Sequence, residues 1–260
     1  MELSVRNASC GYGTTAILSD INLSIKQGEI VCILGPNGIG KTTVFRSVLG
    51  FLKLISGEIY LDDTPRDSLT SKEFAKSVGY VPQSHTPPFA FTVPDVVVMG
   101  RTAHLSNFKA PGMRDYMIAD RVMEMLNITY LREKNYTQIS GGERQMVLVA
   151  RALAQNPKII VMDEPTANLD FGNQINVLKT IKSLSARGLG VLMTTHNPDH
   201  AFLCCDRVIL LTKHKEVLVG TVDEIVTEDN LARAYGVEVK ITETVTPSGN
   251  IVRSCVPVLD

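Results

Sequence analysis

The stretch Gly35-Pro36-Asn37-Gly38-Ile39-Gly40-Lys41-Thr42-Thr43 constrains what this chain can fold into more than any other. It fits the pattern G-x-x-x-x-G-K-[ST] of a phosphate-binding loop. Residues 29–34 before it are apolar after the initial Glu29 and include three β-branched residues, which predicts a buried strand. Residues 44–49 after it place apolar side chains at helical spacing, and Gly50 is a typical helix stop. A chance glycine-rich turn is the alternative, but strand, loop and helix in this order favour a nucleotide-binding loop.

The chemistry of such a loop comes from its backbone and three side chains. Glycines let the chain curl so that successive N–H groups point at phosphate oxygens, and the following helix adds a partial positive end. We expect Lys41 to reach the β- and γ-phosphates, the Thr42 hydroxyl to bind Mg²⁺, and Thr43 to hydrogen-bond a phosphate oxygen. The loop therefore predicts nucleotide binding, and the rest of the chain must say for what purpose.

Composition limits the class of protein. The 260 residues are 44% hydrophobic and 20% charged, which is ordinary for a globular protein with a large core. The net charge of −1 shows no basic excess that would point to nucleic-acid binding, and a local basic patch is the alternative. No secretory signal is recognised at the N-terminus, and no apolar run approaches the roughly 18 residues of a membrane span. The five cysteines form no C-x-x-C pair, so a zinc site or a disulfide framework is not expected. Cys204 and Cys205 could be redox-active, but buried positions at a helix end are favoured.

The order of the predicted elements favours an α/β protein. Residues 3–7 alternate as an edge strand would, residues 11–13 form a turn, and strands follow at 21–25, 57–61 and 78–82, with a short helix at 71–77. Residues 84–89 are a loop. Helical patterns at 92–101 and 114–127 indicate a helical subdomain inserted at about 84–150. Strands at 159–162 and 190–194 around a helix at 171–187 predict a parallel sheet. Strands at 208–211 and 216–219 and a helix at 228–235 end this part, and residues 237–258 predict a β-hairpin.

A second constellation ends the strand at 159–162, where Asp163 and Glu164 follow four apolar residues. Carboxylates at the end of a core strand are costly unless a cation or hydrogen bonds meet them. In a phosphate-loop protein that edge of the sheet faces the nucleotide. Asp163 is then expected to hold Mg²⁺, through water, and Glu164 to orient or deprotonate an attacking water. A solvated strand end is the alternative.

The segment Ser140-Gly141-Gly142-Glu143 precedes a strongly periodic helix. Ser-x-x-Glu is a capping box, in which the serine caps the helix and the glutamate reaches back. That interpretation does not explain two consecutive glycines, which cost helix stability. Free backbone N–H groups at a helix start bind anions, so the segment also predicts a second phosphate contact.

Three single residues are weaker candidates. His196 follows the strand at 190–194 and could contact a γ-phosphate. Gln83 follows the strand at 78–82, and its amide could ligate a metal or hold water. Tyr12 could stack on a base, which contributes roughly 1–3 kcal/mol where aromatic rings meet nucleic-acid bases. Taken one at a time, each is better explained as an ordinary structural residue.

Together these residues resemble the nucleotide-binding subunit of ABC transporters, from about residue 3 to residue 235. Tyr12 matches the adenine-stacking aromatic, Gly35 to Thr43 match Walker A, and Gln83 matches the Q-loop. Ile139 to Glu143 match the signature, Asp163 and Glu164 end Walker B, and His196 matches the switch histidine. The segment Ala167-Asn168-Leu169-Asp170 matches the D-loop, which adds Asp170 to the nucleotide-binding set. The resemblance implies a P-loop NTPase core with a mixed sheet, an N-terminal antiparallel β subdomain and an inserted helical subdomain.

The same resemblance implies how the chain works. It implies a head-to-tail homodimer that binds two ATP, each held by Walker A of one copy and by Ser140, Gly141 and Gly142 of the other. It also implies that Thr42, Gln83 and Asp163 hold Mg²⁺, that Glu164 activates a water for attack, and that His196 contacts the γ-phosphate. Gln83, also a catalytic candidate, is expected to relay changes at the ATP site to the helical subdomain. Two integral-membrane permease subunits hold the dimer at the cytoplasmic face of the membrane, a substrate-binding protein acts indirectly, and nucleic acid is not a partner. Residues 1–236 are expected to form one ATPase domain, and residues 237–260 a hairpin extension.

The sequence departs from the family at three positions. The signature usually begins with Leu and ends with Gln, whereas this chain has Ile139 and Glu143, and Ile39 replaces the small residue usual in Walker A. Little loss of function is expected from any of them, because Ile for Leu conserves volume and the loop acts through its backbone. Within the family the chain most resembles importers of metal chelates, such as iron–siderophore, haem and cobalamin. Residues 87–91 and 99–108 look most like the molybdate or tungstate branch.

Two other functions compete with import. Soluble ABC ATPases that act on ribosomes or DNA usually carry two fused cassettes, a long coiled coil or a zinc insert, and this chain has one cassette and no heptads. An exporter subunit is the other alternative. Co-purification of a polytopic membrane partner separates transport from soluble roles, and a substrate-binding protein separates import from export.

Overall fold

The fold is built around a central six-stranded sheet. The computed structural model describes residues 1–83, 90–106 and 109–259. The strand order in this sheet is β10-β9-β3-β8-β7-β6. Strands β9, β3, β8, β7 and β6 are parallel to one another, and β10 pairs antiparallel with β9, so the sheet is mixed as predicted. The bounds of these strands are β3 Ile30–Leu34, β6 Val78–Val81, β7 Ile159–Met162, β8 Gly190–Thr195, β9 Arg207–Leu211 and β10 Val217–Thr221.

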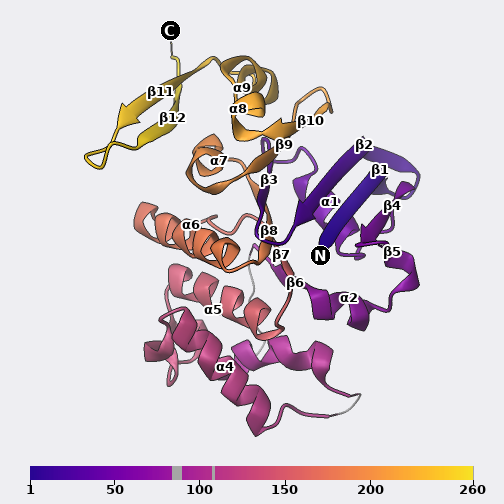
Figure 1. The fold of residues 1–260 in the computed structure, drawn as a ribbon, viewed down its shortest axis with the longest axis vertical. Coiled ribbons are helices and arrows are strands. Elements are labelled where there is room, and N and C mark those ends of the chain that lie inside the picture. The colour runs from indigo at the N-terminus through magenta and orange to yellow at the C-terminus, as the bar shows by residue number, and fades with distance from the viewer. Residues whose placement is uncertain (84–89, 107–108, 260) are drawn as a thin grey trace.

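A second, antiparallel sheet precedes the core and has the order β2-β1-β4-β5 (Figure 1, indigo). Its strands are β1 Glu2–Tyr12, β2 Thr15–Lys26, β4 Ser56–Leu61 and β5 Thr64–Pro65. The prediction of an edge strand at residues 3–7 is wrong, because β1 pairs with both β2 and β4. Alternation reports that one face of a strand is buried, and it does not report whether a strand lies at the edge. Pairing of β1 with β2 also continues to Tyr12, so the turn begins at Gly13 rather than at Gly11.

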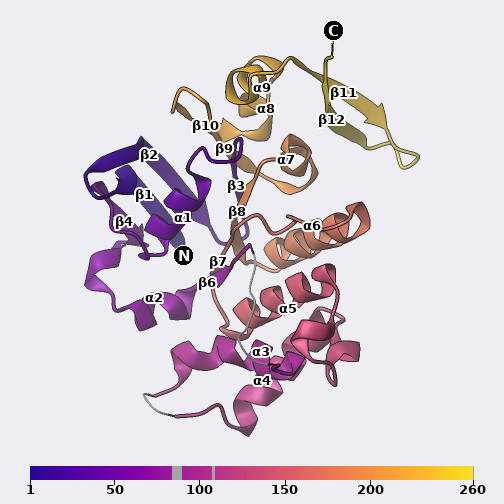
Figure 2. The same ribbon diagram turned by 180° about the vertical axis from the view of Figure 1, so that it is seen from behind.

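Helices fill the stretch between β6 and β7, as the sequence predicts. They form the magenta region at one end of the molecule in Figure 1, and Figure 2 shows the same grouping from behind. The bounds are α3 Val93–Val98, η2 Met99–His104, α4 Met113–Met125, η3 Thr129–Leu131, η4 Tyr136–Gln138 and α5 Gly141–Ala154. Of the stretches that suggested a molybdate or tungstate importer, residues 87–89 and 107–108 lie outside the described residues, as does the loop predicted at 84–89.

The remaining helices flank the sheets. Two lie in the first part of the chain together with a short 3-10 turn: α1 Lys41–Val48, η1 Arg66–Ser68 and α2 Ser71–Ser77. Four follow β7: α6 Phe171–Ala186, α7 Pro198–Cys204, α8 Val222–Ile225 and α9 Glu228–Tyr235. Helices α7 and α8 have seven and four residues and were not assigned from a periodic pattern, although α2, also seven residues long, was predicted. Cys204 is buried and ends α7, as expected for a structural cysteine, and all five thiols are free.

The chain ends in the predicted hairpin of β11 Val239–Val245 and β12 Ile251–Pro257. This hairpin extends to one side of the molecule and packs against α7 and α9 (Figure 1, yellow). The division of the chain into a domain at 1–236 and an extension at 237–260 stays a prediction, and residue 260 lies outside the described residues.

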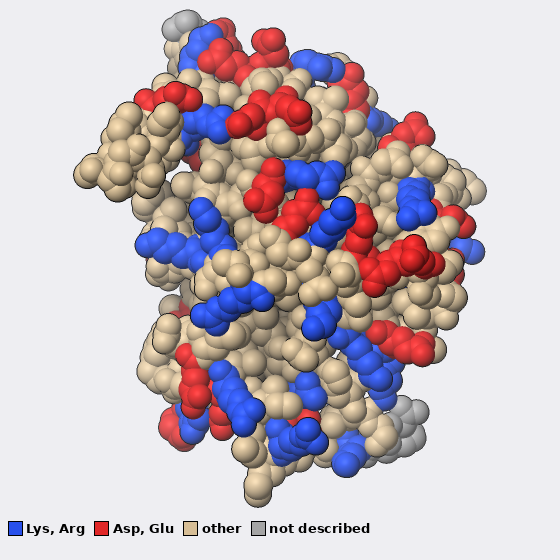
Figure 3. All heavy atoms as spheres, viewed as in Figure 1, with Lys and Arg blue, Asp and Glu red and all other residues tan. Residues whose placement is uncertain are grey.

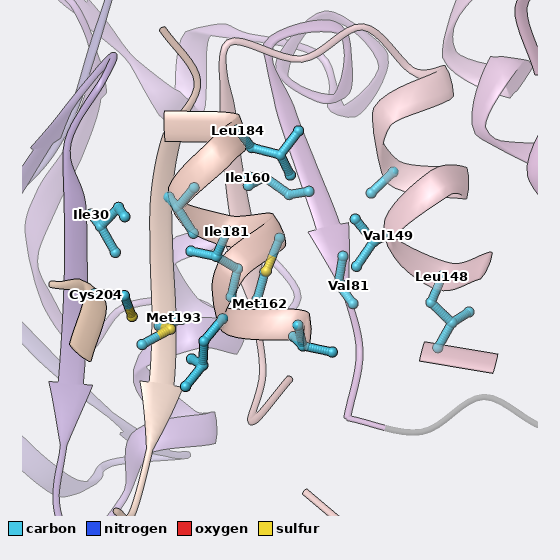
Figure 4. Close-up of a cluster of buried hydrophobic side chains, with 14 of the residues drawn as sticks. Ile30, Val81, Leu148, Val149, Ile160, Met162, Ile181, Leu184, Met193 and Cys204 are labelled. Atoms are coloured by element: carbon cyan, nitrogen blue, oxygen red, sulfur yellow. The ribbon is translucent and has the colours of Figure 1, made fainter. Parts of the chain in front are cut away.

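Apolar side chains cover both faces of the central sheet. On one face, alternate residues of β3, β7 and β8 pack against α5, α6 and α7, and on the other they pack against α1 and the antiparallel sheet. Figure 4 shows Ile160, Met162 and Met193 of the sheet beside Ile181 of α6. Burial on both faces explains why β3 and β7 read as continuous apolar runs rather than as alternating patterns. Among the described residues, no helix combines the length and apolar character needed to cross a bilayer.

Candidate functional site

The loop between β3 and α1 has the conformation that its glycines predict. Gly38 and Gly40 have φ angles of 79° and 116°, in the region where a side chain would be strained. Gly40 also approaches Ile17 and Leu18 so closely that an added Cβ would lie 3.0 Å from each side chain. The loop therefore requires glycine here, both for its backbone angle and for its packing against β2.

A cavity of about 300 Å³ opens beside this loop and collects predicted residues from three parts of the chain. Gln83 comes from the segment after β6 and Glu164 from the segment after β7. The cavity is lined by Asn37, Gly38, Gly40, Lys41, Thr42, Thr43, Gln83 and Glu164. The strands β6, β7 and β3 are parallel members of one sheet, and their carboxyl ends therefore meet at this edge.

Lys41 Nζ makes three polar contacts at the cavity. Its side chain is buried, and its Nζ donates to the backbone oxygens of Gly35 at 2.9 Å and Pro36 at 3.1 Å. The same Nζ lies 3.1 Å from Oε1 of Glu164, which is also largely buried. A paired ammonium of this kind can exchange its carboxylate partner for the phosphate oxygens of a nucleotide without becoming an unpaired buried charge.

Asp163 lies beneath the cavity and is 4% exposed. Its Oδ1 accepts a hydrogen bond of 2.8 Å from the Thr194 hydroxyl. Burial raises the pKa of the Asp163 carboxyl, and hydrogen bonds from Thr194 and Thr42 act in the opposite direction. The hydroxyl of Thr42 and the carboxylate of Asp163 thus lie together, with the amide of Gln83 on the same cavity. Mg²⁺ prefers such oxygen ligands, few in number and supplemented by water and phosphate, so this donor set fits Mg²⁺.

Glu164 adopts a left-handed backbone conformation with φ of 43°, which is uncommon for a residue other than glycine. Its N–H donates to Oγ1 of Thr194 at 2.8 Å, which fixes this turn. The carboxylate then lies between Lys41 and His196, whose Nδ1 is 3.3 Å from Oε2. Strained residues of this kind are concentrated at functional sites, where the surrounding structure holds them in place.

Sequence reasoning missed several residues that support this edge. Thr194 could have been found, because β7 and β8 are parallel and in register, which puts it beside Asp163. His200 could not, since α7 was not predicted. Its Nδ1 lies 2.9 Å from Oγ1 of Thr195, and burial lowers the pKa of its ring to about 4. Tyr235 donates from its hydroxyl to the backbone oxygen of His196 at 2.8 Å, across 39 positions of sequence.

The segment 140–143 lies elsewhere and forms the capping box that the sequence predicts. The N–H of Glu143 donates to Oγ of Ser140 at 3.3 Å, and the N–H of Ser140 donates to Oε2 of Glu143 at 2.8 Å. Gly142 has a packing reason as well, because an added Cβ would lie 2.5 Å from the side chain of Asn173. Gly141 has no such reason among the described residues, the nearest atom to its Cβ position being Leu169 Cδ2 at 3.7 Å.

Asp170 lies close to this segment and not at the cavity of the phosphate loop. It caps α6, with Oδ1 accepting from the N–H of Asn173 at 2.8 Å and Oδ2 from the Asn173 side chain at 2.7 Å. Since Asn173 also contacts Gly142, the starts of α5 and α6 form one surface. The described site candidates that do not line the cavity of the phosphate loop are Tyr12, Gly35, Pro36, Ile39, Ser140, Gly141, Gly142, Asp163, Asp170 and His196.

Comparison with known proteins agrees with this geometry. The ABC transporter family matches residues 18–167, more than half of the chain. The molybdate import ATP-binding protein of Haemophilus influenzae is 35% identical over 90% of this chain and 87% of its own length. The iron(3+)-hydroxamate import ATP-binding protein of Bacillus subtilis is 32% identical over 92% of this chain and 89% of its own. A solved structure of a metal-chelate type ABC transporter in an inward-facing conformation superposes with a TM-score of 0.88, 32% identity, and coverage of 99% and 97% of the two chains.

Proposed function

The chain belongs to the ABC transporter family of ATP-binding subunits, and from that premise we propose that it hydrolyses ATP to power an importer. The cargo is proposed to be a metal chelate or metal oxyanion, such as an iron–siderophore, haem, cobalamin, molybdate or tungstate. The names of relatives about one third identical support this cargo class.

Lys41 and Glu164 line one cavity, and Glu164 contacts both Lys41 and His196; this arrangement is the observation that carries the proposal. A lysine among backbone amides suits the β- and γ-phosphates, as a mobile positive charge. Glu164, next to the place where the γ-phosphate would lie, can accept a proton from an attacking water, and His196 can donate a hydrogen bond toward the phosphate oxygens. Catalysis is then mainly positioning and electrostatic stabilisation, as in other phosphoryl transfers.

We propose that Thr42, Gln83 and Asp163 hold Mg²⁺, with Asp163 acting through water. When bound, the ion neutralises charge that develops on the phosphate oxygens. The chain's own contribution is to keep the Asp163 carboxylate in place, which it does through the 2.8 Å hydrogen bond from Thr194.

A head-to-tail homodimer with composite sites is the proposed active form. Gly142 and Glu143 line a cavity of about 400 Å³ between α5, α6 and the segment that follows α4, separate from the 300 Å³ cavity at Lys41. One chain therefore presents its two anion-binding candidates on different surfaces. Two copies facing each other would complete two sites, each with Lys41 of one copy and Ser140 to Gly142 of the other.

The partner in the membrane is proposed to dock where the helical region between β6 and β7 meets α2 and β6. A cavity of about 350 Å³ is lined by Phe51, Phe74, Tyr80 and Met99, among others, from α2, β6 and the helical region. Phe51 is 68% exposed and its ring meets that of Tyr80 edge-on. Tyr80 lies three residues before Gln83, so a cytoplasmic segment of a permease seated here would be linked to the ATP site. The chain would then lie at the cytoplasmic face of the membrane, held by its permease.

Mixed charge on the surface suits a subunit that meets protein rather than nucleic acid. Figure 3 shows Lys and Arg interspersed with Asp and Glu on one face.

A soluble ABC ATPase or an exporter subunit is the competing function. Co-purification of a polytopic membrane partner with the wild type would separate transport from a soluble role. If that partner docks at Phe51, Phe51→Ser should lose it while still binding ATP. Retention of the partner by the variant would contradict the docking surface.

Reconstitution tests the function as a whole. The chain and its permease are placed in liposomes, and ATP hydrolysis is measured with a panel of metal-chelate and oxyanion binding proteins, loaded and empty. One loaded binding protein should stimulate hydrolysis several-fold over its empty form. Equal hydrolysis with every member of the panel would count against import of this cargo class.

A further inference from the structure

The C-terminal hairpin is fastened to two helices through one pair of opposite residues. Ile241 of β11 and Cys255 of β12 face each other across the hairpin. Both of their N–H groups point outward to carboxylates. Ile241 donates to Oε1 of Glu228 at 3.0 Å, and Cys255 donates to Oδ1 of Asp199 at 2.8 Å. Glu228 begins α9 and Asp199 lies in the first turn of α7, so the hairpin bridges the starts of these helices.

Side chains strengthen both attachments. Ser254 donates from its hydroxyl to Oδ2 of Asp199 at 3.1 Å, which occupies the second oxygen of that carboxylate. Lys240 Nζ lies 3.0 Å from Oε2 of Glu228. Hydrogen bonds to a charged acceptor are stronger than neutral ones, and each carboxylate here receives two. The hairpin is therefore held in a defined place rather than tethered by its linker alone.

Both bridged helices lead to His196. Helix α7 begins at Pro198, two residues after His196. Helix α9 ends at Tyr235, whose hydroxyl donates to the backbone oxygen of His196 at 2.8 Å. Burial raises the pKa of Tyr235, so this hydroxyl stays protonated and able to donate. The His196 backbone is thus held by α9 directly, and the start of the helix that follows it is held by the hairpin.

We propose that Tyr235 is a positioning residue that sets His196 toward the γ-phosphate, and that the hairpin holds Tyr235 and α7 in place for this purpose. The proposal rests on the proposed function, because it takes His196 to act on ATP. The imidazole Nδ1 lies 3.3 Å from Glu164 in the present arrangement. A shift of the His196 backbone would move the ring relative to Glu164 and to the phosphate, while the phosphate loop would be unaffected.

The first test removes only the Tyr235 hydroxyl. Tyr235→Phe is expected to lower kcat for ATP hydrolysis about three- to tenfold, the size expected for one lost hydrogen bond, with KM and ATP affinity unchanged. Tyr60→Phe is the matched control, because its hydroxyl also donates one hydrogen bond, to Glu58 at 2.6 Å on the antiparallel sheet. Assays are run far below the melting temperature. A kcat equal to that of the wild type would overturn the proposal.

A double-mutant cycle then separates positioning from stability. His196→Ala alone should nearly abolish turnover, and adding Tyr235→Phe should change it no further, because the residue being positioned is gone. If His196→Ala retains full turnover, the proposed function of His196 fails. If His196→Ala is inactive but Tyr235→Phe behaves as wild type, only the positioning role fails. Multiplicative loss in the double variant would also overturn positioning through His196.

A third variant tests the hairpin itself. Cys255→Pro removes the N–H that reaches Asp199, and because that N–H points out of the hairpin, no ladder bond is lost. We expect kcat to fall about two- to fivefold, as for a single hydrogen bond. Ile251→Pro is the control, since alternation gives residue 251 the same outward N–H. Equal turnover of these two variants would overturn the role of the hairpin.

Discussion

The two candidate anion sites of this chain, the phosphate loop and the start of α5, differ in the groups that each offers to a phosphate. The phosphate loop lies on the edge of a buried sheet, and its Lys41 already holds a carboxylate and two carbonyl oxygens. At the start of α5, Ser140 and Gly141 are exposed and Gly142 is buried, and the capping groups of Ser140 and Glu143 bond to each other. At the first site, the Lys41 ammonium can pair directly with the phosphates of a nucleotide. The second offers only backbone groups and geometry, so it can contribute only when another surface brings a phosphate to it.

Substituting one carboxylate at each site should give the largest contrast. Glu164→Gln keeps the shape but removes the proton acceptor, so turnover should fall about 10²–10⁴-fold, as for loss of general base catalysis. ATP binding should persist or tighten, because Lys41 is released from its ion pair. Single-turnover hydrolysis and ATP titration measure the two effects separately.

Glu143→Gln is the matched control in the second region. It changes the same chemical group in a capping box that glutamine can also form, so turnover should stay within about twofold of the wild type. Normal hydrolysis by Glu164→Gln, or a collapse of hydrolysis in Glu143→Gln, would contradict the division of roles between the two regions.

Mixing experiments test whether the two regions act across a dimer. Lys41→Ala should weaken ATP binding at least about 100-fold, and Ser140→Arg should block hydrolysis, since it places a bulky cation at the second site. A heterodimer of the two variants contains one composite site with both substitutions and one with neither. Random mixing makes half of the dimers heterodimers, so about a quarter of wild-type activity should return if the sites are independent. Absence of any recovered turnover would reject composite sites that act independently of each other.

Acid should lower the free energy of unfolding mainly through the buried ring of His200, near the edge of the central sheet. His200 supports the end of β8, and burial lowers the pKa of its ring from 6.5 to about 4. Between these values the unfolded chain takes up a proton that the folded chain does not, so the free energy of unfolding falls as the pH falls. The loss is at most about 3 kcal/mol between pH 6.5 and 4. Urea unfolding of His200→Gln should show less of this loss, whereas the exposed His214→Gln should follow the wild type.

These comparisons show what the sequence could and could not predict. The phosphate loop, Asp163 and Glu164 were predictable, because apolar strands of fixed length deliver them to the same edge of a parallel sheet. Thr194 was missed, although the register of β7 and β8 places it beside Asp163. His200 and Tyr235 were not predictable, because their partners depend on the packing of short helices far along the chain.

Errors and omissions had equally physical causes. The alternation in β1 correctly indicated one buried face, but pairing partners decide whether a strand lies at an edge, and local pattern does not contain them. The two glycines at the start of α5 were both assigned to anion binding. Gly142 is also required by its contact with Asn173, which comes from a helix 30 residues later and could not be inferred.

The adjacent glycines provide the finest test of the second region. Gly142→Ala places a methyl group 2.5 Å from the side chain of Asn173, which is held by Asp170, so the free energy of unfolding should drop by about 1–3 kcal/mol. Gly141→Ala has room, and alanine is the better helix former by about 0.5–1 kcal/mol, so this variant should melt at or above the wild-type temperature. If the N–H groups at Gly141 approach a phosphate of the facing copy, the stable variant should nevertheless lose hydrolysis. A Gly141→Ala protein that is both stable and fully active would leave the start of α5 as a helix cap and nothing more.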